Sequence, residues 1–128
     1  MVGAALLAVA MWLAPAQTDQ GEAARAIVPP PPAAVLRLAL LGRDLAAADL
    51  LWLRTVYFVG SPTSETIHYA GLEHWIERIV ELSPDFLLPY FVGGILLATA
   101  PDGAKHAERI LALGEDAMPN NFEFPMWR

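Results

Sequence analysis

The stretch "ELSPDFLLPYF" (residues 81–91) decides the fold, because its pattern returns as "DAMPNNFEFPMW" (residues 116–127). Pro84 and Pro119 are 35 residues apart, and each follows one helical pattern and precedes another. Proline disrupts the interior of a helix, so it separates neighbouring helices. Self-similarity at such a period is typical of stacked helix pairs, since each pair needs a neighbour to bury its apolar face. We therefore expect an all-α fold of stacked antiparallel helical hairpins.

Apolar residues recur at helical spacing from Ala33 onward, and no segment alternates with the period of a strand. Gly42 and Pro62 interrupt the first part of this pattern, and Pro84 and Pro119 interrupt the rest. Glu73, Glu77 and Glu81 share one helix face and indicate a charged outer surface. The predicted helices cover residues 34–41, 44–59, 63–82, 87–99 and 103–117, with a further unit opening at residue 121.

The second pair resembles the tetratricopeptide repeat (TPR), whose period is 34 residues. Counting back from Pro119, Ala107, Leu111 and Gly114 stand where that family has a small, a bulky and a small residue. Tyr90 and Gly94 fit its first helix if the turn is one residue longer. The resemblance implies that the small residues let the two helices of a hairpin approach closely. It assigns repeat packing to Trp52, Pro84, Tyr90, Gly94, Ala107, Leu111, Gly114 and Pro119.

The first pair departs from the TPR pattern. Counting back from Pro84 gives Leu72, Ile76 and Ile79, so both small positions are lost, and Trp52 takes the aromatic place. The stretch "LGRDLAAADLLWLRTVYFVG" (residues 41–60) is similar to the opening helix of a group of bacterial membrane-anchored TPR-like proteins. This resemblance implies a fold and a location at the cell envelope, but no activity.

Three segments divide the chain. Residues 1–16 are uncharged and apolar, which favours a signal peptide or membrane anchor over the alternative of a buried helix. Residues 17–35 contain "PPPP" and indicate a stiff spacer. Residues 36–128 form the helical repeat domain, which we expect to be truncated at its C-terminal end. The expected location is therefore the inner membrane facing the periplasm, or the periplasm itself.

No arrangement of residues indicates catalysis. The net charge of −6 and the scattered basic residues argue against nucleic acid, and the absence of cysteine excludes disulfides and thiolate metal sites. His68 and His74 are six residues apart with no third ligand, so no metal or cofactor is expected. Asp49 and Arg54 interrupt an apolar helix, and an ion pair with the neighbouring unit is the simplest interpretation.

The expected function is that of a non-enzymatic scaffold or assembly factor that binds a protein or peptide. In the TPR register, the partner groove is lined by the first helix of each hairpin, with Leu53 and Tyr57 followed by Phe91 and Ile95. These side chains are apolar, so they predict a hydrophobic helix or peptide as partner. The alternative is a small integral-membrane subunit with a second span at residues 86–100, which has 15 uncharged residues where a span needs about 20.

Overall fold

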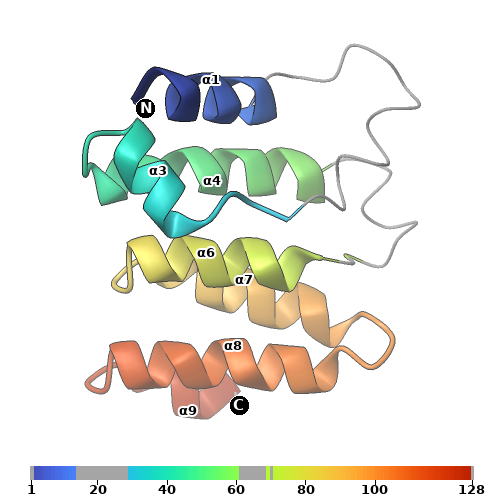
Figure 1. Cartoon of the computed structure of the whole chain (residues 1–128). Helices are drawn as coiled ribbons and strands as arrows, with labels where there is room; N and C mark the ends of the chain where they lie inside the picture. The colour runs from blue at the N-terminus through green and yellow to red at the C-terminus, as the bar shows by residue number, and fades with distance from the viewer. Residues whose placement is uncertain (1, 14–28, 61–68, 70, 128) are drawn as a thin grey trace.

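The computed structural model describes residues 2–13, 29–60, 69 and 71–127, and every regular element in these ranges is an α-helix. The fold is therefore all-α in the described part of the chain, as the sequence predicted. Successive helices lie one above another with alternating direction, and α7 and α9 lie behind α6 and α8 in the view of Figure 1. The helices are α1 (Val2–Leu13), α3 (Ala33–Ala39), α4 (Asp44–Val59), α6 (Leu72–Leu82), α7 (Leu87–Ala98), α8 (Ala104–Ala117) and α9 (Glu123–Trp127).

The contacts follow the order of the chain. Helix α4 packs on α6, α6 on α7, and α7 on α8, which is the most extensive contact, and α8 packs on α9 (Figure 1). At the other end, α1 packs on α3. In the described part of the chain, no helix is both long enough and apolar enough to cross a membrane.

The prolines lie at the joints between helices. Pro84 lies two residues after the end of α6, and Pro119 lies two residues after the end of α8. Pro89 and Pro125 are each the third residue of the next helix, where the backbone N–H would have no partner within the helix. The similar stretches 81–91 and 116–127 thus place their prolines alike, with one proline before the next helix (α7 or α9) and one at its third position.

One predicted helix begins later than expected. The sequence predicted a helix over residues 63–82, but α6 begins at Leu72. Tyr69 and Gly71 have φ values of 56° and 83°, which lie in the left-handed region that an α-helix cannot contain. The prediction was wrong here because apolar periodicity continues through Gly71 without showing the turn. Residues 61–68, with the predicted helix start at Ser61, lie outside the described residues.

Two hydrophobic clusters form the core, and α6 contributes to both. The first joins α1, α3 and α4 to Ile79 and Leu82 of α6, and it includes the buried Val9 of α1. The second joins Leu72 and Ile76 of α6 to α7, α8 and α9. Trp52 packs against both clusters from α4, and its ring meets Phe86 edge-on at 5.6 Å between centroids. Helix α6 and Trp52 therefore link the two clusters, so the described helices do not separate into independent pairs.

Close approach of α7 to its neighbours depends on two glycines. A Cβ atom on Gly93 would lie 2.9 Å from Ile76 of α6, and one on Gly94 would lie 3.1 Å from Leu111 of α8. Both distances are shorter than ordinary van der Waals contact. Larger residues at these positions would push α7 away from α6 or α8, so the glycines set the spacing of the stack.

Candidate functional site

The residues assigned to repeat packing are mostly buried. Tyr90, Ala107 and Leu111 belong to the second core cluster, Gly94 and Gly114 are also buried, and Trp52 is half-buried between the clusters. A Cβ atom on Gly114 would lie 2.3 Å from the ring of Phe124, so this glycine makes room for α9. Pro84 and Pro119 are exposed at the turns.

The residues assigned to the groove are mostly exposed. Leu53 and Tyr57 of α4 are 65% and 70% exposed, and Ile95 of α7 is 47% exposed. Phe91 differs from them, because it is half-buried and its ring stacks on Phe124 of α9 at 5.0 Å between centroids. The structure thus leaves three of the four side chains accessible to a partner, and uses the fourth mainly to dock α9.

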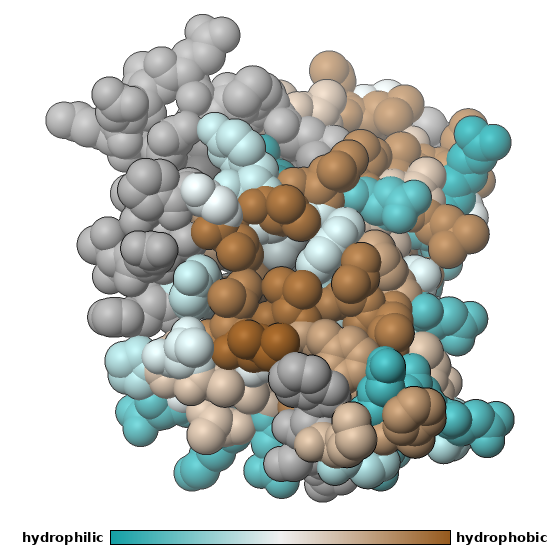
Figure 2. Space-filling model, turned by 180° about the vertical axis from the view of Figure 1, so that it is seen from behind, coloured by the Kyte–Doolittle hydropathy of each residue, from teal (hydrophilic) through white to brown (hydrophobic). Residues whose placement is uncertain are grey.

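The exposed groove residues belong to a wider surface, which we call the apolar face. Buried residues of α4 recur at Ala48, Leu51 and Thr55, so the opposite side of this helix, with Leu53 and Tyr57, points away from the core. Figure 2 views the molecule from the side of α7 and α9 and shows hydrophobic side chains gathered across the middle of this surface. The apolar face comprises Leu50, Leu53, Val56 and Tyr57 of α4, Leu88 and Ile95 of α7, and Met126 of α9.

The opposite side of the stack is charged. Glu77 of α6 forms an ion pair with Arg109 of α8, with 2.8 Å between Oε1 and Nη2, and Glu73 of α6 contacts His106 of α8. Within α6, Arg78 pairs with Glu81. The sequence predicted the glutamate row as an outer surface, but it did not predict that two of these glutamates would join α6 to α8. Helix-to-helix pairs depend on how the helices approach, which spacing along one helix does not show.

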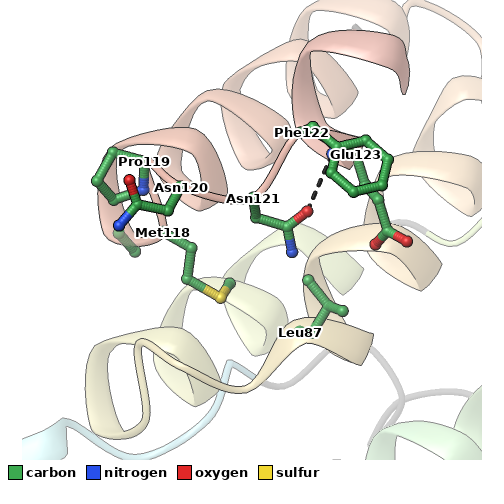
Figure 3. Close-up of a pocket in the computed structure, with 8 residues that line it drawn as sticks. Leu87, Met118, Pro119, Asn120, Asn121, Phe122 and Glu123 are labelled. Carbon is green, nitrogen blue, oxygen red and sulfur yellow. Dashed lines mark hydrogen bonds between the residues drawn. The ribbon is translucent and has the colours of Figure 1, made fainter.

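An open cleft of ≈ 660 Å³ lies at the joint between α8 and α9, beside the start of α7. In Figure 3, Met118 and Leu87 approach it from opposite sides, and the amide of Asn121 faces the backbone of the next turn. The Asn121 side-chain oxygen accepts a hydrogen bond from the Glu123 backbone N–H at 2.9 Å, which caps the start of α9. The cleft is lined by Leu87, Ala117, Met118, Pro119, Asn120, Asn121, Phe122 and Glu123.

Tyr90 of α7 carries a titratable hydroxyl in a largely buried environment. Burial, together with the negative charge of Asp85, raises the pKa of the Tyr90 hydroxyl to about 12. The hydroxyl donates a hydrogen bond to the Pro84 carbonyl oxygen at 3.0 Å, and the ring packs edge-on against Phe124. A neutral, hydrogen-bonded phenol beneath a turn stabilises structure and does not resemble an acid or base placed to act on a substrate.

The predicted ion pair of Asp49 is not formed with the described residues. Asp49 is exposed on α4, and its carboxylate makes no ion pair in the described part of the chain. The described residues also contain no group of three or more His, Cys, Asp or Glu side chains that could hold a metal ion. His68 lies outside the described residues.

Comparison with protein-family models, with curated proteins and with solved structures finds no match for this chain.

Proposed function

We propose that this chain is a non-enzymatic interaction module, a scaffold or assembly factor of the bacterial cell envelope that binds a protein partner on the apolar face. The observation that carries the proposal is the exposure of large apolar side chains on α4, α7 and α9, on the side opposite the charges of α6 and α8. Soluble monomers rarely expose contiguous apolar patches of more than a few hundred Å², and larger patches mark sites of interaction.

The TPR-like interpretation belongs to the same proposal. It is supported by the alternation of helices along the stack, in which α4 and α7 each precede a packed partner, α6 and α8. It is also supported by the burial of Gly94 against Leu111 and of Gly114 against Phe124. In repeat proteins of this kind, the first helices of successive pairs together form the partner surface.

Exposure of the apolar face favours a hydrophobic helix or extended peptide as the partner. Tyr57 combines a large apolar ring with a hydroxyl group, the kind of residue that is enriched among the strongest contributors to interfaces. We favour this function over a second membrane span at residues 86–100. Tyr90, Gly93 and Gly94 are buried against neighbouring helices, which leaves α7 only one exposed side.

The location at the cell envelope rests on the resemblance of residues 41–60, because the apolar segment 1–16 contains α1, which packs on α3 and buries Val9 in the core. An alkaline phosphatase fused after Arg128 tests it, because that enzyme matures only outside the cytoplasm. We expect activity from the fusion, and an inactive fusion that is nevertheless made in full would reject the location without affecting the proposed binding.

A photo-reactive amino acid tests the binding surface in cells. Placed at Tyr57 or Ile95, it should give discrete cross-linked products, and placed at Lys105 on the charged side of α8 it should give none. Leu53→Lys should reduce the products formed from Tyr57, since a charge in the apolar face opposes docking. Equal cross-linking from Lys105 and Tyr57 would show that the apolar face is not the partner surface.

A further inference from the structure

Acidic residues border the apolar face. Asp49 is exposed on α4, one turn before Leu53, and Glu123 lies one turn before Met126 on α9. Asp85 is exposed in the turn that leads into α7. None of these three carboxylates forms an ion pair with another residue in the described ranges.

The basic residues are placed differently, except for Arg43, which is exposed directly before the start of α4. Arg78 and Arg109 pair with glutamates on the side of α6 and α8, and Arg37 pairs with Asp44 at 3.0 Å near the start of α4. Helix α7 carries no charged side chain, and α4 carries the half-buried Arg54. The border of the apolar face thus has acidic groups without partners, while several arginines are already engaged elsewhere.

We propose that the partner on the apolar face is an amphipathic helix whose apolar stripe is flanked by lysine or arginine. This inference rests on the proposed function and adds the charge of the partner to it. A helix that lays its apolar side in a hydrophobic surface presents side chains at i, i+3, i+4 and i+7, with the flanking positions near the border. Basic flanks would meet Asp49, Asp85 and Glu123, and complementary charge raises the rate of association and selects among partners.

The same charges disfavour two other occupants. A second copy of the chain would bring an identical acidic border, and its own net charge of −6, against the first. A bilayer rich in anionic lipid would repel the acidic border, because such surfaces attract basic segments. A basic amphipathic helix can pack its apolar stripe on the apolar side chains and pair its basic flanks with the carboxylates.

Designed peptides test the inference with the full chain. Two fluorescent 18-residue peptides share the same leucine stripe, and one has lysine flanks while the other has glutamate flanks. We expect the lysine peptide to bind about tenfold more tightly at low ionic strength, with a smaller difference as salt screens the border. Fluorescence anisotropy measures both affinities, and a scrambled lysine peptide should bind much more weakly than the striped one.

Charge-reversal variants test whether the acidic border causes the preference for the lysine peptide. Asp49→Lys or Asp85→Lys should reduce the preference for the lysine peptide severalfold, while Asp116→Lys on the exposed end of α8 makes the same change in net charge and should leave the preference unchanged. An equal loss with Asp116→Lys would mean that net charge, and not the border, selects the peptide, and would overturn the inference.

The remaining outcomes separate the inference from the proposed function. If both peptides bind equally, and Leu53→Ala with Tyr57→Ala weakens both, the apolar face binds helices but the charge inference fails. If neither peptide binds, both proposals fail. Binding to phosphatidylglycerol vesicles, or a dimer in sedimentation that Leu53→Lys disrupts, would replace the basic helix with a membrane or a second copy.

Discussion

At the scale of single residues, Tyr90 makes contacts with two other elements that the sequence pattern did not predict. It is almost fully buried, its hydroxyl bonds to the turn at Pro84, and its ring contacts Phe124. The sequence placed Tyr90 in the aromatic position of a helix pair, but its hydrogen bond depends on the path of the turn after α6. One residue thus links the end of α6, the start of α7 and the docking of α9.

The raised pKa of Tyr90 predicts a loss of stability in alkali. In the unfolded chain the hydroxyl has an ordinary value of 10.0, and in the folded protein its pKa is about 12. Between these values the unfolded state binds fewer protons than the folded state, so the free energy of unfolding falls as pH rises. Below pH 10 both states are protonated and this contribution is complete.

Urea unfolding of Tyr90→Phe at several pH values measures this effect. At pH 8 the variant should lose about 1 kcal/mol with the hydrogen bond to Pro84. Between pH 10 and 11.5 it should lose stability less steeply than the unmodified chain, because it lacks the group that titrates. Tyr57→Phe, at an exposed position, is the matched control for removing a hydroxyl and should change the free energy of unfolding at pH 8 by less than about 0.5 kcal/mol. Parallel curves for Tyr90→Phe and the unmodified chain would contradict the prediction.

At the scale of elements, α9 shows how a very short helix is held by tertiary contacts. A helix of five residues is not stable alone, so its structure depends on packing. Phe124 is fully buried between Tyr90, Phe91 and the space above Gly114. Phe122, two residues earlier, is 75% exposed.

Two alanine substitutions therefore should have very different effects. Phe124→Ala should lower the free energy of unfolding by about 3 kcal/mol, the lower end of the range for removing a buried phenylalanine. Phe122→Ala should change it by less than about 0.5 kcal/mol, as is usual for exposed positions. Denaturant unfolding of both variants measures the difference. Similar losses, or none for Phe124→Ala, would show that α9 does not dock as described.

Element boundaries were predictable where proline or glycine coincided with the end of an apolar pattern. The sequence predicted residues 44–59 and 87–99, and the helices are Asp44–Val59 and Leu87–Ala98. The start of α6 was not predictable, because Tyr69 adopts a positive φ that its residue type rarely takes, and Gly71 fits a helix as well as a turn. Periodicity reports which side of a segment is apolar and not where the backbone reverses.

The candidate site was predictable only in part for a similar reason. Helical register identified Leu53, Tyr57 and Ile95, which are exposed on α4 and α7. The half-burial of Phe91 depends on α9, whose docking through Phe124 cannot be read from the spacing of residues in α7. The pair of Glu77 with Arg109 likewise depends on the approach of two helices, each of which was predicted separately.

At the scale of the whole molecule, the stack has two unlike sides. The side of α6 and α8 carries ion pairs in which an exposed basic side chain, His106 or Arg109, meets a half-buried glutamate. The apolar face carries little charge, and its exposed side chains do not contribute to the core (Figure 2). Solubility in the absence of a partner should therefore be limited by the apolar face, while stability is determined by the core beneath it.

The double substitution Leu53→Lys with Ile95→Lys separates these two properties. Both side chains are exposed, so the free energy of unfolding should change by less than about 1 kcal/mol in total, which is two surface effects of about 0.5 kcal/mol each.

Solubility should rise and the fluorescence of a bound hydrophobic dye should fall severalfold, because the contiguous apolar surface is interrupted. Ala104→Lys with Asp116→Asn makes the same change in net charge on the side of α8, from −6 to −4, and should neither raise solubility nor reduce dye fluorescence, because it leaves the apolar face intact and brings the net charge closer to zero. Were dye fluorescence to fall equally in both variants, the change in net charge would explain the effect, and the apolar face would not be the surface that the dye reports. A loss of several kcal/mol in the first variant would instead show that Leu53 and Ile95 belong to the core.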